Sequence, residues 1–345
     1  MNNYHKKLKF LLLHPDKIIT DVQEISCFSN VLGYYLSNEL AKHVDVTNVV
    51  VSTKTSNDEL GIWFDNLDVD GYDAILGLGL RYFSTIPKDI VKKLKQRVYP
   101  SLLCQIYDGS RLDTDNIDIT FTIKNDDLDP KYCHGATASR YIRHRAFNEY
   151  IGWAADSKLN TPAQEGGALH ILVDHTNYGK NPIDSTVDVV NQVKEFYNSR
   201  IWRDRWNSVI LRRFDSGKIS NIDPTINEVI KKYDRTSLPY TEVCAEHCKT
   251  HVFLVTHPES VGLVVLETAT AGALVVTPKG YIPNDRLQTV RHIEYEDSIN
   301  WQTVLDNIDV AASRKIAIEN SWETVAKRIR DGVRIRQLIR GQQDD

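Results

Sequence analysis

The sequence predicts an α/β protein made of two Rossmann-like, doubly wound domains. Short apolar runs typical of buried parallel strands alternate with helical patterns for most of the length. At about 150 residues per domain, a chain of 345 residues is long enough for two domains. Near the middle of the chain, polar, Gly and Pro residues interrupt the alternation, which then starts again.

The N-terminal domain is predicted to span residues 1–152 around a parallel sheet. It opens with a βαβ pattern, and two further apolar runs bounded by turn residues continue the sheet. The elements expected in order are a strand at Leu8–Leu13, a helix over about 26–43, strands at Val46–Ser52 and Ala74–Gly77, a Lys-rich helix at Asp89–Arg97 and a strand at Ser101–Ile106.

The C-terminal domain is predicted to span residues 169–320, after a linker at 153–168. A second α/β series of similar size fits a second doubly wound sheet. The elements expected in order are a strand at Leu169–Asp174, a helix at Pro182–Tyr197, strands at Ser208–Arg212 and His251–Thr256, a short helix over about Leu263–Ala271 and a strand at Ala273–Thr277.

Composition and charge exclude several classes of protein. The chain is 41% hydrophobic and 26% charged, which is ordinary for a globular protein and excludes a disordered or fibrous one. A net charge of −4 gives no global basic field, so nucleic acid or anionic lipid would need a local patch. The apolar run Phe10–Leu13 is too short for a signal-peptide core or a membrane span, and we expect a cytoplasmic protein.

The five cysteines agree with a reducing compartment because they are scattered and odd in number. Cys244 and Cys248 lie one helical turn apart with His247 between them, a spacing that suits metal ligands. No second cluster completes four ligands, so two half-buried helix cysteines are expected there. The D-x-D sequences at Asp68–Asp70 and Asp113–Asp115 are typical of acidic loops, and no metal site is expected.

The most informative segment is Thr256–Pro278, in which a strand, a polar loop containing Gly262 and an apolar helix follow one another. Backbone N–H groups and the positive end of the helix dipole would lie at the carboxyl edge of the sheet, where they suit a phosphate. Glu259 precedes the turn, and Glu267 lies within the helix, where a carboxylate is costly to bury without a partner. Ribose hydroxyls would be such partners; the alternatives are that Glu267 projects to solvent or meets a lysine.

This segment resembles the donor-site signature of retaining GT-B glycosyltransferases, the class that includes glycogen-synthase-like and sucrose-synthase-like enzymes. The resemblance rests on Pro258–Glu267 with its E-x7-E pair, the glycine inside it, and Ala271-Gly272 before an apolar strand. It covers about Leu169–Arg336 and is architectural only for the N-terminal domain. It implies two Rossmann-like domains that face a cleft, with a C-terminal helix in 321–345 that crosses back to the N-terminal domain.

The resemblance implies roles for five residues of this segment. Glu267 would accept hydrogen bonds from the two ribose hydroxyls of a nucleotide sugar. Glu259 would fix the hydroxyls of the donor sugar. The N–H groups near Ser260, Val261 and Gly262 would hold phosphate.

Cationic partners for the leaving diphosphate are expected after the first strand of the C-terminal domain. Lys180 matches the family's lysine, and Lys180 and Glu259 are the predicted catalytic residues. The arginine usual a few residues earlier is absent, and Asp174 stands in that region. The second positive charge would come from Arg212, from Arg213 or from His175.

The implied activity is that of a hexosyl- or pentosyltransferase. It would move a sugar from a nucleotide-diphosphate sugar to an acceptor hydroxyl with retained anomeric configuration, the acceptor being a saccharide or glycoconjugate. Charge builds on the leaving phosphate, so preorganised positive groups accelerate the step. No cofactor or metal is required if lysine, arginine and the helix N-terminus carry this charge.

The N-terminal domain is expected to bind the acceptor. Asp108 and Arg111 follow a strand and would point toward the cleft, and His134 precedes the linker. Ordinary loop residues without a role are the alternative at all three positions.

Basic and aromatic residues interleave at Arg140–Arg145, Arg200–Trp206 and Lys327–Arg340. Such patches can follow the phosphates of DNA or an anionic membrane face, although solvated helix faces show the same pattern. These patches leave open a phage-type transferase acting on modified DNA bases and peripheral membrane contact. The missing arginine, and the absence of a glycine-rich loop after the first strand, also leave open a non-catalytic sugar-nucleotide-binding or scaffold protein.

Overall fold

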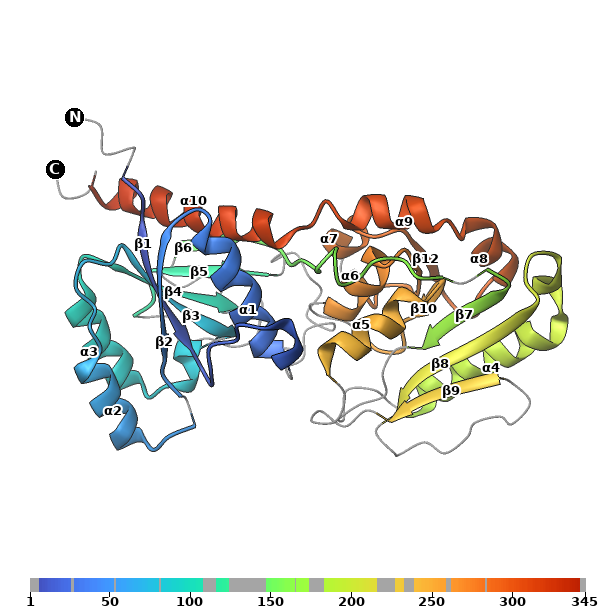
Figure 1. The fold of residues 1–345 in the computed structure, drawn as a ribbon, viewed down its shortest axis with the longest axis horizontal. Coiled ribbons are helices and arrows are strands. Elements are labelled where there is room, and N and C mark those ends of the chain that lie inside the picture. The colour runs from blue at the N-terminus through green and yellow to red at the C-terminus, as the bar shows by residue number, and fades with distance from the viewer. Residues whose placement is uncertain are drawn as a thin grey trace. The chain divides into compact units, whose positions relative to one another are not determined.

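The computed structural model divides the chain into two compact units, each with its own parallel sheet (Figure 1). Unit 1 comprises Met1–Trp153 and Trp322–Asp345, and unit 2 comprises Ala154–Ser321. The residues that the structure describes are 6–25, 28–52, 54–80, 82–107, 116–123, 147–164, 166–173, 183–215, 227–232, 239–258, 262–282 and 284–341. The predicted α/β class with two doubly wound sheets is confirmed.

The sheet of unit 1 has six parallel strands in the order β2-β1-β3-β4-β5-β6. The chain passes from β1 to β2 on one side and then to β3 on the other, so the strand order reverses at β1. The strands are β1 (Lys9–His14), β2 (Asp45–Val50), β3 (Ala74–Leu80), β4 (Leu102–Tyr107), β5 (Ile119–Thr122) and β6 (Phe147–Tyr150). The last two are additional to the strands expected from the sequence.

Helices cover both faces of this sheet. The helices α2 and α3 pack their apolar residues against one face, and α1 lies on the other face together with the last helix of the chain (Figure 1). A capping box between Ser56 and Glu59 fixes the start of α2. The helices are α1 (Phe28–Ala41), α2 (Asn57–Asn66), α3 (Lys88–Val98) and α10 (Trp322–Gly341), with short 3-10 turns at Val22–Glu24 and Tyr82–Thr85.

The C-terminal helix α10 is part of unit 1. Trp322 at its start stacks on Tyr35 of α1 with ring centroids 5.2 Å apart, and it meets Trp153 edge-on at 5.0 Å. Gly332 faces Phe121 of β5, and a Cβ atom built on this glycine would lie 2.9 Å from the Phe121 ring. The absence of a side chain at Gly332 therefore lets α10 approach the sheet closely.

The sheet of unit 2 also has six parallel strands, in the order β12-β11-β10-β7-β8-β9. The chain runs from β7 through β8 to β9 on one side and then from β10 through β11 to β12 on the other. The strand order therefore reverses between β7 and β10. The strands are β7 (Ala168–Val173), β8 (Ser208–Asp215), β9 (Asn227–Lys232), β10 (Val252–Leu254), β11 (Leu274–Pro278) and β12 (His292–Tyr295).

Two groups of helices surround the sheet of unit 2. The helices α4 and α8 pack on one face, where Phe196 stacks on Trp301 with ring centroids 4.3 Å apart. The helix α6 packs against both α5 and α9. The helices are α4 (Ile183–Ser199), α5 (Tyr240–Cys248), α6 (Leu263–Thr270), α7 (Asn284–Leu287), α8 (Trp301–Asn307) and α9 (Val310–Ala317), with a 3-10 turn at Ile201–Asp204.

Candidate functional site

The segment that carries the predicted donor signature leaves the sheet of unit 2 where the strand order reverses. Strands β7 and β10 are hydrogen-bonded neighbours on the two sides of this reversal. Doubly wound sheets bind their ligands at such a point, beyond the carboxyl ends of the strands. Along the sequence, the stretch predicted to supply the cationic partners of the diphosphate, Val173–Lys180, continues from β7, and the signature Pro258–Glu267 follows β10.

Gly262 sets the start of α6. Its φ of +65° lies in the left-handed region, where a side chain is strained, and its carbonyl accepts the first helical hydrogen bond from Leu266 at 2.9 Å. The glycine inside the E-x7-E signature is thus the residue at which the chain turns from loop into helix. A phosphate held by N–H groups at this turn remains a prediction.

Gly272 ends the same helix and lets it pack against α9. Its φ is +97°, and a Cβ atom at this position would come within 2.4 Å of Cγ1 of Val310. Ala271 before it is fully buried. The small-residue pair of the signature is therefore required by the close packing of α6 and α9.

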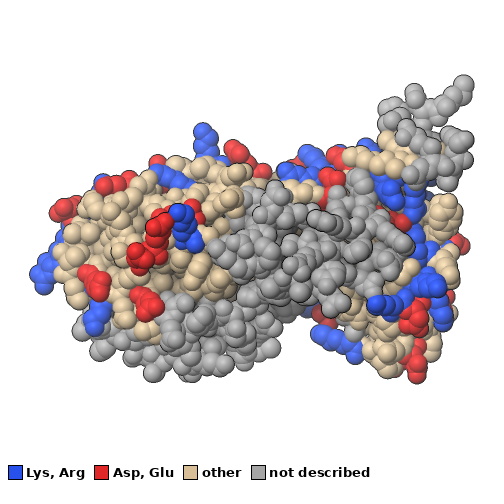
Figure 2. Space-filling model, turned by 180° about the vertical axis from the view of Figure 1, so that it is seen from behind, with Lys and Arg blue, Asp and Glu red and all other residues tan. Residues whose placement is uncertain are grey.

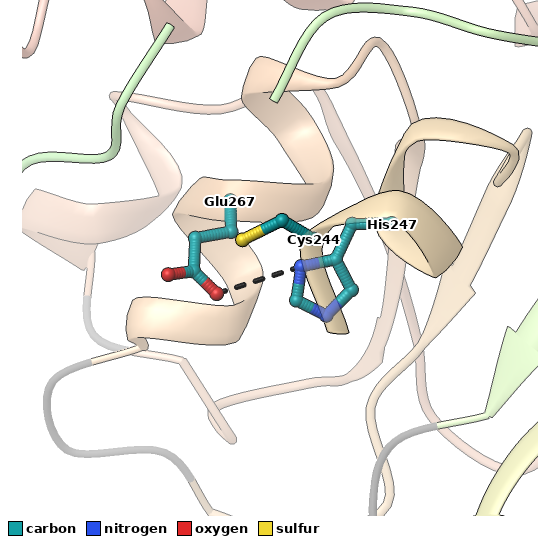
Figure 3. Close-up of side chains that lie close together, drawn as sticks. All are labelled: Cys244, His247 and Glu267. Carbon is teal, nitrogen blue, oxygen red and sulfur yellow. Dashed lines mark ion pairs between the residues drawn. The ribbon is translucent and has the colours of Figure 1, made fainter. Parts of the chain in front are cut away.

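Glu267 is buried in α6 and faces α5. Only 2% of its surface is exposed, the Tyr240 hydroxyl donates to Oε1, and Nδ1 of His247 lies 3.5 Å from Oε2 (Figure 3). Burial raises the pKa of the Glu267 carboxyl to about 8; the Tyr240 hydrogen bond lowers this pKa, and the charge of Asp156 raises it. The carboxylate therefore meets neither solvent nor a lysine among the described residues, and its contact with ribose stays a prediction.

Cys244 lies on the same face of α5 as His247 and also faces Glu267. Together, Cys244, His247 and Glu267 form what we term the buried triad, whose ligand-type atoms all lie within 4.8 Å of one another (Figure 3). Burial raises the pKa of the Cys244 thiol far above its usual range, and the charge of Glu267 adds to this rise. Cys248 points elsewhere, with Sγ 3.4 Å from the Leu159 carbonyl oxygen.

The partners of Glu267 are not apparent from the sequence. The sequence pattern places Cys244, His247 and Cys248 on one helix and assigns no role to Tyr240. The i, i+3 spacing of Cys244 and His247 places both on one helix face, which is a usable signal. The packing of that face against Glu267 depends on tertiary structure.

Arg212, one candidate for the second positive charge, lies in a buried polar cluster of unit 2. Its guanidinium donates to the Glu246 carboxylate of α5, and its Nε donates to Nδ1 of His170 at 2.8 Å. The His170 backbone N–H donates in turn to Nδ1 of His251 at 3.1 Å. Burial, with a smaller contribution from His170, lowers the pKa of His251 to about 4. The side chain of Arg212 is thus engaged by neighbouring side chains.

The remaining predicted site residues lie outside the described part of the chain, and their roles stay predictions. They are Asp108, Arg111, His134, His175, Lys180, Glu259, Ser260 and Val261. The basic segment Arg140–Arg145 and the acidic sequence Asp113–Asp115 also lie outside it.

Unit 1 has a buried polar group at the carboxyl end of β1. Nε2 of His14 lies 2.8 Å from Oδ1 of Asn48, which also accepts a hydrogen bond from the Ser37 hydroxyl at 3.2 Å. Gly33 of α1 lies against the ring, since a Cβ there would be 3.2 Å from Nδ1. Burial lowers the pKa of His14, and the Asn48 hydrogen bond partly offsets this.

The aromatic residues of the basic segment Arg200–Trp206 are packed within unit 2. Trp202 is buried with Arg203 over its ring at 5.4 Å, and Trp206 meets the ring of His251 edge-on at 4.5 Å. These rings are therefore engaged by the protein itself and do not form an open stacking platform.

Four of the six basic residues of α10 have partners among the described residues. The ion pairs and hydrogen bonds are Lys327 with Glu323, Arg330 with Asp331, Arg340 with Asp118, and Arg328 with the Ile151 carbonyl oxygen. On the face shown in Figure 2, cationic and anionic side chains are interspersed over the described surface. This arrangement is typical of a solvated protein surface.

Among the described residues, no helix is both long enough and apolar enough to span a membrane. The D-x-D sequence at Asp68–Asp70 has both aspartates exposed, in the loop between α2 and β3.

The fold is similar to that of several proteins of known structure. No family model and no curated protein sequence matches the chain. A sucrose-phosphate synthase from Thermosynechococcus elongatus superimposes with a TM-score of 0.61 at 12% identity, over 97% of this chain and 100% of that one. A trehalose-6-phosphate synthase gives 0.56 at 9% identity, over 94% and 98% of the two chains. The lipopolysaccharide outer core galactosyltransferase WaaB gives 0.54 at 9% identity, over 94% and 99%.

These three similarities extend over nearly the whole length of both chains. At identities of 9–12% they show the fold. The chain therefore has the two-sheet architecture of GT-B glycosyltransferases, as its sequence predicts.

Proposed function

We propose that this protein is a glycosyltransferase that moves a sugar from a nucleotide-diphosphate sugar to an acceptor hydroxyl. One observation carries the proposal. The two segments with the donor-site pattern follow the neighbouring strands β7 and β10, at the reversal of strand order where doubly wound sheets bind ligands. The structural similarity to GT-B glycosyltransferases over nearly the whole chain supports the same reaction class.

Glu267 is proposed to bind the ribose through Oε1. This oxygen accepts a hydrogen bond from the Tyr240 hydroxyl, and Tyr240 is partly exposed at the start of α5. The other carboxyl oxygen, Oε2, faces the buried His247. A ribose hydroxyl would replace the Tyr240 hydroxyl at Oε1, exchanging one O–H donor for another. The exchange keeps the buried carboxylate hydrogen-bonded throughout.

The remaining donor contacts follow from the resemblance and are proposed with it. Glu259 would hold the sugar hydroxyls, the backbone before α6 would bind phosphate, and Lys180 would neutralise the leaving diphosphate. Because Arg212 already donates to Glu246, we favour His175 for the second positive charge. The reaction then needs no metal and no cofactor.

We further propose retention of the anomeric configuration and a saccharide or glycoconjugate acceptor. Trehalose-6-phosphate synthase, one of the similar structures, transfers its glycosyl group with retention, and this supports the first point. Asp108, Arg111 and His134 remain the acceptor candidates. The local pairing of the described basic and aromatic residues gives no support to a DNA acceptor, and a cytoplasmic location and membrane contact stay predictions.

Nucleotide binding tests the donor site. Melting temperatures of the wild type, Glu267→Gln and Glu242→Gln would be measured with uridine, guanosine and adenosine diphosphates and with their sugar conjugates. Glu242 is the matched control because it lies on the exposed face of α5. One nucleotide should stabilise the wild type and Glu242→Gln by about 2.7 kcal/mol at a hundredfold excess over its Kd, which raises their melting temperatures. The melting temperature of Glu267→Gln should not change.

Turnover then separates an enzyme from a scaffold. With the nucleotide identified, its sugar conjugates would be incubated with a panel of saccharides, and the anomeric configuration of the product would be read by NMR. Binding without turnover across the panel would favour the non-catalytic alternative. A folded wild type that no nucleotide stabilises would refute the proposed donor site.

A further inference from the structure

The buried triad contains the three donor types that zinc binds most often in proteins. We propose that Cys244, His247 and Glu267 form a binding site for one zinc ion between α5 and α6 (Figure 3). A thiolate sulfur, an imidazole nitrogen and a carboxylate oxygen are a borderline-soft ligand set. Such a set favours zinc over magnesium or calcium, which prefer oxygen ligands alone.

The spacing of the ligand atoms is close to that of a tetrahedral centre. Zinc bonds of about 2.0–2.3 Å at tetrahedral angles separate neighbouring ligand atoms by roughly 3.3–3.6 Å. Nδ1 of His247 and Oε2 of Glu267 are already 3.5 Å apart, and no pair in the triad exceeds 4.8 Å. Small rotations of the Cys244 and Glu267 side chains would therefore close the site without moving either helix.

The backbone holds the three ligands on two packed helices. Cys244 and His247 are separated by three positions on α5 and share a face, and Glu267 projects toward that face from α6. Both helices are packed in unit 2, so the backbone that carries the ligands is in place before a metal binds. Preordered ligands reduce the entropy lost on binding.

The surroundings of the triad favour a cation. Cys244 and His247 are fully buried, and Glu267 is 2% exposed. Asp156 adds negative potential at both Cys244 and Glu267. The guanidinium of Arg314 donates to three backbone carbonyl groups of the same region, so its hydrogen bonds do not go to these carboxylates. A divalent cation would neutralise the carboxylate and a thiolate together. The thiol proton, and the carboxyl proton wherever Glu267 is protonated, would leave to solvent.

Tyr240 completes the arrangement as an outer partner. Its hydroxyl donates to Oε1, which leaves Oε2 directed at His247 and at the proposed metal. Hydrogen bonds of this kind orient metal-binding carboxylates. Water is the usual fourth ligand when a protein supplies three.

This inference goes beyond the proposed sugar transfer. The zinc ion would link α5 to α6 by coordinating Oε2 of Glu267, and the ribose would hydrogen-bond to Oε1. The ion would therefore stabilise the donor half without taking part in the transfer step.

Cobalt(II) is the probe that tests the site. The full chain would be treated with a chelator, freed of it, and titrated with cobalt(II) in the absence of nucleotide. A thiolate ligand gives a near-ultraviolet charge-transfer band, and four-coordination gives intense visible bands. We expect both to saturate at one equivalent and to disappear when one equivalent of zinc is added.

A matched pair of variants assigns the sulfur. Cys244→Ser should lose the charge-transfer band and bind at least about tenfold more weakly, because serine keeps the size but not the thiolate. Cys248→Ser, one helical turn later with its sulfur at the Leu159 carbonyl, should keep the wild-type spectrum. Glu267→Gln should keep the charge-transfer band and bind more weakly. Circular dichroism would establish that each variant is folded.

The inference is overturned if the wild type shows no charge-transfer band, or if Cys244→Ser retains it. Should Cys244→Ser fail to fold, the wild-type titration still decides whether a thiolate site exists, and Cys248→Ser decides whether Cys248 forms it. A chain that binds cobalt through Cys244 but binds no nucleotide would keep this inference and lose the proposed function. A chain that binds a nucleotide but gives no cobalt charge-transfer band would keep the proposed function and overturn this inference.

Discussion

Gly272 combines a left-handed backbone with a close contact to the next helix, and the two effects can be separated. At Gly272 a Cβ would meet Val310 at 2.4 Å, whereas at Gly71, with φ +77°, it would meet nothing within 4 Å. Alanine at Gly71 should therefore cost about 1–2 kcal/mol through backbone strain alone. Alanine at Gly272 should cost about 1–3 kcal/mol more, because the overlap must be relieved by moving α6 or α9.

Urea denaturation of the two variants measures this difference. Relative to the wild type, Gly272→Ala should lower the free energy of unfolding of unit 2 by more than Gly71→Ala lowers that of unit 1, and the difference is the packing contribution. Equal losses would mean that the Ala271-Gly272 pair is needed only for its backbone conformation.

His251 makes the stability of unit 2 depend on pH. Its pKa is about 4 in the folded chain and near 6.5 in the unfolded chain, so the unfolded state binds more protons between these values. The stabilisation is complete above pH 6.5 and is lost as the pH falls toward 4. The whole contribution is about 3 kcal/mol.

His251→Asn removes this titration and keeps an acceptor for the His170 backbone N–H. Unfolding free energies of the wild type and the variant would be measured at pH 7.5 and pH 5. The wild-type advantage should shrink by about 2 kcal/mol at the lower pH, since only the proton-linked part changes. An advantage that is the same at both values would contradict the assignment to His251.

At single residues, the sequence identifies Glu267 as unusual but does not reveal its surroundings. A glutamate within an apolar helix requires a partner, and the pattern alone favours ribose, solvent or a lysine. The partners present are Tyr240 and His247, which lie on a different helix. Their identity depends on which face of α5 packs against α6, and local periodicity does not encode that choice.

At the scale of elements, α10 is held to unit 1 by its first aromatic residue. Trp322 is 4% exposed and contacts Tyr35 and Trp153, whereas Leu338 on the same helix is 50% exposed. Trp322→Ala should destabilise unit 1 by about 3–5 kcal/mol, and Leu338→Ala should change its stability by less than about 0.5 kcal/mol. Chemical denaturation followed by circular dichroism compares the two. Similar effects would contradict the role given to Trp322.

The elements that the sequence predicts well are those with long apolar runs. The strands expected at Leu8–Leu13 and Leu169–Asp174 lie within one residue of β1 and β7. Strands β5 and β6 are not predicted, because Ile119–Thr122 and Phe147–Tyr150 are short and half polar. Such edge-side strands are specified by pairing with a sheet that already exists, which is a tertiary effect.

At the scale of the whole molecule, a destabilising substitution in one unit should promote unfolding of that unit alone, because the two sheets have separate cores. The chain passes between the units only at Trp153–Ala154 and Ser321–Trp322. Trp322→Ala should therefore increase amide hydrogen exchange mainly in the strands of unit 1, and Gly272→Ala mainly in those of unit 2. Exchange measured by mass spectrometry over peptides of both units checks this. Equal increases in both units for either variant would show that the chain unfolds as one cooperative block.

The place of α10 also sets the order in which the units can be completed on the ribosome. The strands of unit 1 are translated first, but the helix that covers Tyr35 and Phe121 is translated only after all of unit 2. Unit 2 is contiguous and can acquire all its elements while unit 1 still exposes an aromatic surface. A nascent chain stalled before Trp322 would therefore carry a finished second unit and an unfinished first one, the kind of intermediate that chaperones and proteases recognise.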